Sequence, residues 1–180
     1  MRYVLAFLGG LTVLSGMVPA VEAGSKCPAG GFVINAGQAF AAASRQGSAS
    51  AFINAASRYA DTRSIALSAL GIHRKKLSRA DEGEYVRLAQ SFMGRFMARH
   101  ASKFNVSGLK VTTCSANIVS ASSSSGKKVI FRVGKGRGGY RVQDVNVSSI
   151  WLAGQMRTTF VGVLNRNNGD ISALMKYLRG

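Results

Sequence analysis

Acidic residues are scarce in this chain. Seven aspartates and glutamates stand against 24 lysines and arginines, which gives a formal net charge of +17. Catalysis by paired carboxylates therefore has few residues to draw on. A balance this basic instead predicts affinity for polyanions, such as nucleic acid, anionic membrane surfaces or acidic head groups.

Histidine and cysteine are also rare, with two of each. His73 and His100 stand far apart, and neither belongs to a His-x-x-Glu-His or Cys-x-x-Cys pattern, so we predict no metal site. We expect both histidines to be exposed residues near helix ends. We predict no cofactor and no catalytic residue, and the chain is not expected to be an enzyme.

Asp144 is the one acidic residue inside an expected strand. As a catalytic base, in the manner of cone-shaped isomerase folds, it would need a partner and a substrate pocket. As a structural group, it would accept hydrogen bonds from nearby backbone or from an arginine such as Arg157. We favour the structural role.

No apolar run is long enough to be a typical membrane span. The longest, residues 4–18, follows Arg2 and precedes the small-x-small sequence Val21-Glu22-Ala23, and no basic stop-transfer cluster comes after it. We therefore predict a cleaved signal peptide at residues 1–23, the alternative being an uncleaved anchor, and a single domain at 24–180. Cleavage removes one basic and one acidic residue, so the charge stays at +17. Export makes nucleic acid a poor candidate partner and favours lipid.

Cys27 and Cys114 are expected to form a disulfide in an oxidising compartment, the alternative being two free thiols. The bond would join the start of the mature chain to the middle of the sheet. Closing so long a loop stabilises the fold by roughly 4–5 kcal/mol on the chain-entropy model.

Hydrophobic periodicity divides the chain into helical and extended parts. Helices are expected over residues 32–45, 49–59, 62–70, 78–102, 149–165 and 170–178. Side-chain caps are expected from Ser48, Asp61, Ser78, Ser148, Ser149 and Asp170. The basic run 73–76 is read as a solvated loop.

Strands are expected over residues 109–118, 127–134 and 140–147, with a Ser-rich hairpin loop at 120–126. The alternation changes phase near Cys114, which predicts a bulge or strong bend, and slips again at Gln143-Asp144. The layout predicts an α+β fold, in which a curved antiparallel sheet of three to four strands is wrapped by about six helices. A curved sheet covered in this way can enclose an apolar cavity.

Two stretches resemble the MlaC family, also called the toluene-tolerance family of ABC-transporter auxiliary proteins. The first is Asp144-Val145 followed by Ile150, Leu152, Arg157 and Phe160, although Ser148-Ser149 stand where the family usually has Glu-Gly. The second is the order of a Leu-Gly pair, a basic linker, Ser-x-x-Asp and an aromatic-rich helix over residues 69–96. Together the resemblance covers about residues 49–178.

The resemblance implies a periplasmic, non-enzymatic carrier of phospholipid between the two membranes of Gram-negative bacteria. It also implies two partners, an inner-membrane ABC transporter complex and an outer-membrane lipoprotein complex. A related alternative is a carrier of hopanoid or another polycyclic lipid. The alternative from another class is a secreted polyanion-binding protein with a dry core.

A lipid carrier needs apolar side chains that do not close on one another. Nine residues are expected to line such a cavity: Phe92, Phe96, Val129, Phe131, Val133, Val142, Val147, Trp151 and Phe160. The same residues would fill an ordinary core if no ligand enters. Cys27, Cys114, Asp144 and Arg157 are expected to have structural roles.

Overall fold

The computed structural model describes residues 27–136 and 138–180, so the predicted signal peptide lies outside the described part. The helices are α1 (Gly30–Gln46), α2 (Ala49–Tyr59), α3 (Thr62–Ala69), the 3₁₀-helix η1 (Gly71–Lys76), α4 (Arg79–Arg99), α5 (Ala101–Phe104), α6 (Leu152–Arg166) and α7 (Ile171–Arg179). The strands are β1 (Lys110–Cys114), β2 (Ile118–Ser122), β3 (Lys128–Gly136), β4 (Gly139–Val147) and β5 (Ile150–Trp151).

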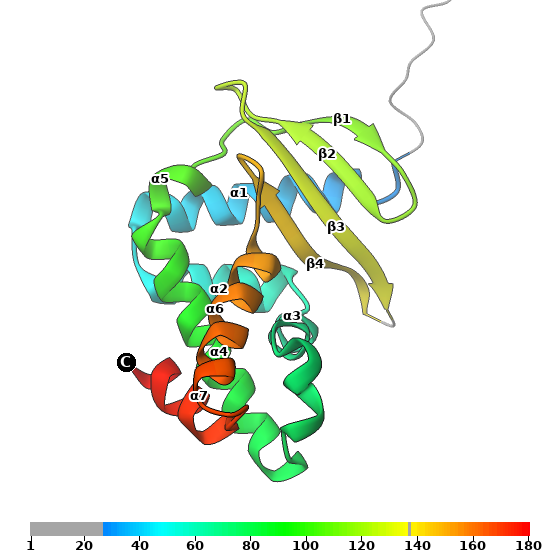
Figure 1. Ribbon diagram of the computed structural model, residues 1–180. Coiled ribbons are helices and arrows are strands. Elements are labelled where there is room, and N and C mark those ends of the chain that lie inside the picture. Colours follow the sequence, from blue (N-terminus) through cyan, green and yellow to red (C-terminus); the bar gives the residue numbers. More distant parts are fainter. Residues whose placement is uncertain (1–26, 137) are drawn as a thin grey trace, which may run out of the picture.

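The strands form one antiparallel sheet in the order β1-β2-β3-β4-β5. Figure 1 shows this sheet at one end of the molecule, with α1 crossing it and the other helices gathered at the opposite end. The predicted α+β class, a bent antiparallel sheet with a helical cover, is confirmed. Within the described residues no helix is long and apolar enough to cross a membrane.

Four of the expected helix caps are present. Each side chain accepts a hydrogen bond from a backbone N–H in the first helical turn: Ser48 from Ala51, Asp61 from Ser64, Ser78 from Asp81 and Asp170 from Ser172. These caps fix where α2, α3, α4 and α7 begin, because they satisfy N–H groups that the helix leaves without partners.

The slip predicted at Gln143-Asp144 is a β-bulge. Arg132 pairs with Asp144 while the next residue, Val133, pairs with Val142, so Gln143 is the extra residue on β4. A bulge increases the local twist and bends the sheet. The curvature expected from the phase of the sequence is therefore present in this strand pair.

The prediction of one bent strand over residues 109–118 is wrong. This segment contains β1, a turn and the start of β2, and the backbone N–H of Ser115 donates to the carbonyl of Ile118 at 2.8 Å to close the turn. The change of phase near Cys114 marks a reversal of the chain, because β2 packs beside β1 rather than continuing it. The Ser-rich loop is correspondingly shorter than expected, since Ser120–Ser122 belong to β2.

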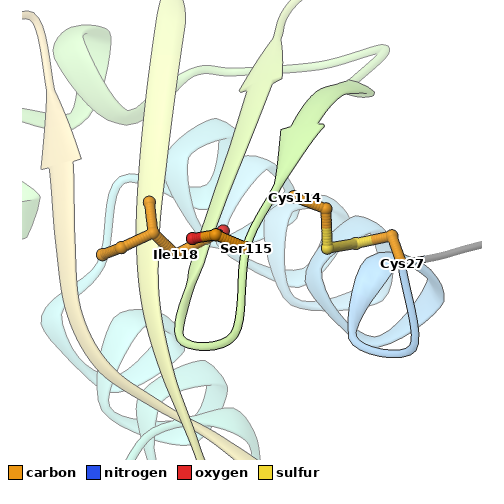
Figure 2. Close-up of a disulfide and its surroundings, with 4 residues drawn as sticks. All are labelled: Cys27, Cys114, Ser115 and Ile118. Atoms are coloured by element: carbon orange, nitrogen blue, oxygen red, sulfur yellow. A yellow bond between two sulfur atoms is a disulfide. The ribbon is translucent and has the colours of Figure 1, made fainter.

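The disulfide between Cys27 and Cys114 is present, with a Cα–Cα distance of 5.6 Å. Figure 2 shows it joining the turn before α1 to the end of β1, next to the Ser115–Ile118 turn. The expectation that it reaches the middle of the sheet is wrong, because β1 is the edge strand. The bond therefore fastens a sheet edge, which is the part of a sheet least held by strand pairing.

The expected helix start at Ser149 is also wrong. Ser148 and Ser149 have positive φ angles of 51° and 67° and form a two-residue turn, after which Ile150 and Trp151 pair with Val147 and Asn146. Two consecutive residues of this conformation are typical of a tight hairpin turn. Helix α6 starts at Leu152, and it is capped from a distance by Asp144, which accepts a hydrogen bond from the N–H of Ala153.

The helices and the sheet share one hydrophobic core. Tyr85 is a fully buried member of this core and donates from its hydroxyl to the carbonyl of Ala66 at 2.6 Å. Helices α2 and α4 lie close together at Gly94, where an added Cβ would lie 2.8 Å from the carbonyl oxygen of Ala49. Small residues at such crossings let the two helix axes come close together.

Candidate functional site

A row of aromatic rings runs from the core to the surface along α4. Phe160 of α6 is fully buried, and its ring centroid lies 5.2 Å from that of Phe92. Phe92 is followed by Phe96 at 6.5 Å, and Phe96 by the imidazole of His100 at 4.7 Å. Residues 92, 96 and 100 are four apart, so they lie on one side of α4. The row therefore links the interior to the C-terminal end of this helix.

The row ends at an apolar cleft of about 210 Å³, which we call the mouth. Phe96, His100, Lys103 and Phe104 form one side of the mouth, and Val147, Ile150, Leu152 and Gln155 form the other. The first side comes from α4 and α5, and the second from β4, β5 and α6. The mouth thus lies where the helical cover meets the last strands of the sheet.

Lys103 and Ile150 give the mouth its two kinds of surface. The side chain of Lys103 is exposed and carries a positive charge next to the apolar lining. Ile150 is 39% exposed, although it is a large aliphatic residue. An apolar opening with a cation at its edge is chemically suited to a ligand that has apolar tails and an anionic head group.

The residues predicted to bind lipid are distributed unevenly around the mouth. Phe96 and Val147 line it, while Phe92 and Phe160 continue inward from it. Four others are buried on β3 and β4, namely Val129, Phe131, Val133 and Val142. Of these, Phe131 packs toward α1, because its Cζ lies 3.9 Å from the position that a Cβ on Gly37 would occupy.

Trp151 does not line the mouth. Its ring lies under the guanidinium of Arg132, with 4.9 Å from Arg132 Cζ to the ring centroid, and it borders a polar surface pocket of about 360 Å³. Leu152, the next residue, lines the mouth instead. The junction of β5 and α6 therefore separates a polar pocket from an apolar one.

Asp144 lies in the wall of the polar pocket and is 5% exposed. Its Oδ1 accepts hydrogen bonds from the N–H groups of Val145 and Ala153, both at 2.9 Å, and its Oδ2 lies 3.9 Å from Arg132. Burial raises the pKa of this carboxyl, and the two backbone bonds and Arg132 oppose that rise. The bonds join β4 to the start of α6.

Arg157 is not the partner of Asp144. Its Nε and Nη2 both donate to the carbonyl oxygen of Ser68, at 3.1 and 2.8 Å, so it links α6 to the end of α3. The expected arginine contact of Asp144 comes from Arg132 on the neighbouring strand instead. Sequence spacing did not reveal this pairing, because the two residues meet only through the register of β3 and β4.

The other carboxylates of the described chain also have structural partners. Asp61, Asp81 and Asp170 act at helix N-termini, Glu82 pairs with Arg63, and Glu84 pairs with Arg179. Among the described residues, no three His, Cys, Asp or Glu side chains are grouped so that they could hold a metal ion. The mouth has no acidic residue in its lining.

Sequence reasoning missed six of the eight residues that line the mouth, since only Phe96 and Val147 were predicted. Phe104, Ile150 and Leu152 line it, yet Phe104 follows the expected end of the long helix and Ile150 was placed inside a helix. The signal that could have revealed part of it is that Ile150 and Leu152 flank Trp151 directly after two serines. This pattern indicates a short hairpin strand once the two serines are recognised as a turn.

A curved sheet under a helical cover, with an apolar mouth at their junction, is an architecture suited to a protein that binds apolar ligands. The chain belongs to the MlaC family, because the family model described as MlaC protein matches residues 33–180. The family is periplasmic and consists of phospholipid-binding carriers without enzymatic activity, so the chain is not an enzyme.

A solved structure supports the fold. The phospholipid-binding protein from Ralstonia solanacearum, determined in complex with a phospholipid, is 20% identical to this chain, with a TM-score of 0.64. The match covers 84% of this chain and 94% of the Ralstonia chain. At this identity the similarity establishes the architecture. The comparison with curated proteins gives no match.

Proposed function

We propose that this chain is a periplasmic carrier that shields the acyl chains of a glycerophospholipid between two membranes. The observation that carries the proposal is the aromatic row that leads from the mouth to Phe160. Membership in the MlaC family and the fold shared with a phospholipid-binding protein support it. Export by the predicted signal peptide at residues 1–23 would place the carrier in the periplasm.

The acyl chains would enter at the mouth and lie against Phe96, Phe92 and Phe160. The cleft of about 210 Å³ is smaller than typical ligand pockets of roughly 300–1,000 Å³. Loading therefore requires the helical cover and the sheet to move apart along the row, with Val147 and the buried valines of β3 and β4 as the opposite wall. Trp151 lies beside this path rather than within it.

The head group would stay at the rim of the mouth, near Lys103 and His100. The ammonium of Lys103 attracts a phosphate, and no carboxylate lines the mouth to oppose it. This arrangement leaves the polar part of the lipid in water, where it needs no buried partner.

The energetics favour carriage without chemistry. Withdrawing about thirty methylenes from water is worth roughly 25 kcal/mol, at about 0.8 kcal/mol each. A bilayer gives nearly the same, so transfer between bilayer and pocket is close to neutral. The partners we propose are those of the family, an inner-membrane ABC transporter complex and an outer-membrane lipoprotein complex.

Native mass spectrometry and organic extraction of the purified protein test the proposal. A bound mass equal to a diacyl glycerophospholipid is expected. A polycyclic lipid mass would point to a hopanoid carrier instead. A bare polypeptide with tight, salt-sensitive binding to DNA would overturn carriage and favour a polyanion-binding protein.

A pair of variants locates the mouth. Ile150→Glu places a charge at the rim and should abolish lipid extraction, since a carboxylate there would have to be desolvated by the tails. Thr158→Glu adds the same charge on an exposed part of α6 and should leave the lipid content unchanged. Equal lipid content in both variants would place the mouth elsewhere.

A further inference from the structure

The most exposed large apolar side chain among the described residues is far from the mouth. Ile72 of η1 is 83% exposed, against 46% for Tyr177 and 39% for Ile150. It directly precedes the run His73-Arg74-Lys75-Lys76, and Arg79 follows in the first turn of α4. We call Ile72, Arg74 and Lys75 the η1 surface. Exposing a large aliphatic side chain such as Ile72 to water is unfavourable, and its neighbours in sequence are cationic.

The η1 surface borders a groove of about 510 Å³. Leu67 and Leu77 provide its apolar floor, and Ile72, Arg74 and Lys75 stand around it. Glu82 also lines the groove, but it is ion-paired with Arg63. The groove therefore combines apolar area with two cations whose charge is not neutralised by the nearest carboxylate.

The helix that carries this surface is held in place. His73 Nε2 is hydrogen-bonded to Asn165 Oδ1 at 2.9 Å, and Lys76 Nζ donates to the carbonyl of Asn168 at 2.8 Å. Both bonds fasten η1 to the end of α6 and the turn after it. Among the residues that the structure describes, Arg74 and Lys75 make no ion pair or side-chain hydrogen bond. The fold thus fixes His73 and Lys76 and leaves the side chains of the η1 surface exposed.

We propose that the η1 surface docks the protein on an anionic membrane. Ile72 enters the boundary between head groups and acyl chains, and Arg74 and Lys75 contact lipid phosphates. Charge complementarity selects this occupant, since an aliphatic side chain among cations matches the order of apolar and anionic layers in a bilayer. The inference goes beyond lipid carriage, because it concerns where the protein rests and does not require a filled mouth.

The two sites lie at opposite ends of α4. The η1 surface precedes Arg79, whereas Phe96 and His100 mark the mouth. A helix of 21 residues is about 30 Å long at 1.5 Å per residue. Figure 1 shows the turn between α3 and α4 at the end of the molecule remote from the sheet. Docking through η1 therefore leaves the mouth uncovered.

Co-sedimentation with vesicles tests the docking. The full mature protein should bind vesicles of phosphatidylcholine mixed with phosphatidylglycerol and should not bind phosphatidylcholine alone. Ile72→Ser should weaken binding about tenfold, because it removes most of the apolar contact. Arg74→Gln with Lys75→Gln should weaken it about thirtyfold, at about 1 kcal/mol per charge.

The matched control removes the same charge elsewhere. Lys110→Gln with Lys128→Gln acts on exposed residues of β1 and β3 and should change binding by less than about twofold. Equal losses in the two double variants would show that only net charge matters and would overturn the η1 assignment. Absence of binding to anionic vesicles would overturn it as well.

A probe on the surface gives an independent readout. Cys27 and Cys114 are paired, so Ile72→Cys offers a selectively labelled thiol for an environment-sensitive fluorophore. Its emission should shift to the blue with anionic vesicles, whereas a label on the exposed Ser57→Cys should not shift. Lipid extraction from Ile72→Ser should equal that of the wild type, so failure of docking and failure of carriage are separable.

Discussion

The carboxylate of Asp144 has a pKa that burial raises, although two backbone N–H groups and Arg132 act to lower it. The folded state therefore binds this proton more readily than the unfolded state does. Between the ordinary and the raised pKa, the contribution of this group to stability falls as the pH rises. The same carboxylate joins β4 to α6 through its two backbone hydrogen bonds.

Asp144→Asn tests this sign. The amide oxygen can still accept from Val145 and Ala153, but the group no longer titrates. The wild type should gain stability relative to the variant as the pH falls from neutral into mild acid. Urea unfolding of both proteins at the two pH values measures the difference, and a constant difference would contradict the raised pKa.

For single residues, the sequence indicates which side chains have a structural role but not which residues they contact. Asp144 stood out because it is an acid among strand formers, and its structural role required no long-range knowledge. Its bond to Ala153 and the attachment of Arg157 to Ser68 join residues 9 and 89 positions apart. Such contacts depend on how α3, β4 and α6 pack, which periodicity does not encode.

Gly94 decides how closely α2 and α4 cross. A Cβ there would meet Ile53 Cγ1 at 2.6 Å and the Ala49 carbonyl oxygen at 2.8 Å, and the carbonyl cannot rotate away. Gly94→Ala should therefore destabilise the protein by roughly 1–3 kcal/mol, in spite of the better helix propensity of alanine. Denaturant unfolding measures the change.

Gly83 provides the control on the same helix. An added Cβ there would meet only the end of the Arg87 side chain, at 3.8 Å. Gly83→Ala should stabilise the protein by about 0.5–1 kcal/mol, since alanine loses less backbone entropy. Stabilisation by both substitutions would show that the helix crossing tolerates a methyl group.

The disulfide closes a loop between residues 87 positions apart. Replacing both cysteines by serine should lower the free energy of unfolding by roughly 4–5 kcal/mol on the chain-entropy model, and adding a reductant to the wild type should have a similar effect. Urea unfolding with and without reductant measures both. The double variant should not respond to reductant, and a wild type that does not respond would contradict a disulfide in solution.

Elements with strong periodicity and side-chain caps were predictable from the sequence. The starts of α2, α4 and α7 follow from the N-cap residues Ser48, Ser78 and Asp170. Tight hairpins were not predictable in the same way, because Ser115–Ile118 and Ser148–Ser149 lack the glycine that usually marks such turns. These two turns account for the missed boundary of β2 and for β5.

The mouth and the aromatic row behind it are built from helices and from the last strands of the sheet. A lipid bound there should therefore stabilise the whole molecule. Any ligand that binds only the folded state raises the melting temperature by mass action. Protein purified with lipid should melt at a higher temperature than protein stripped by organic extraction and refolded. Ile150→Glu should show no such difference, and identical melting of loaded and stripped wild type would contradict binding across the core.

The positions of η1 and the mouth at the two ends of α4 limit the routes by which a lipid could enter the mouth. A molecule attached to a leaflet through η1 turns its opening toward the aqueous gap, roughly one helix length above the head groups. Tails could not then slide straight from that leaflet into the interior. Lipid would then have to reach the mouth from another protein bound beside the carrier. Attachment through η1 would hold the carrier near that protein, and the transfer itself would take place between two proteins.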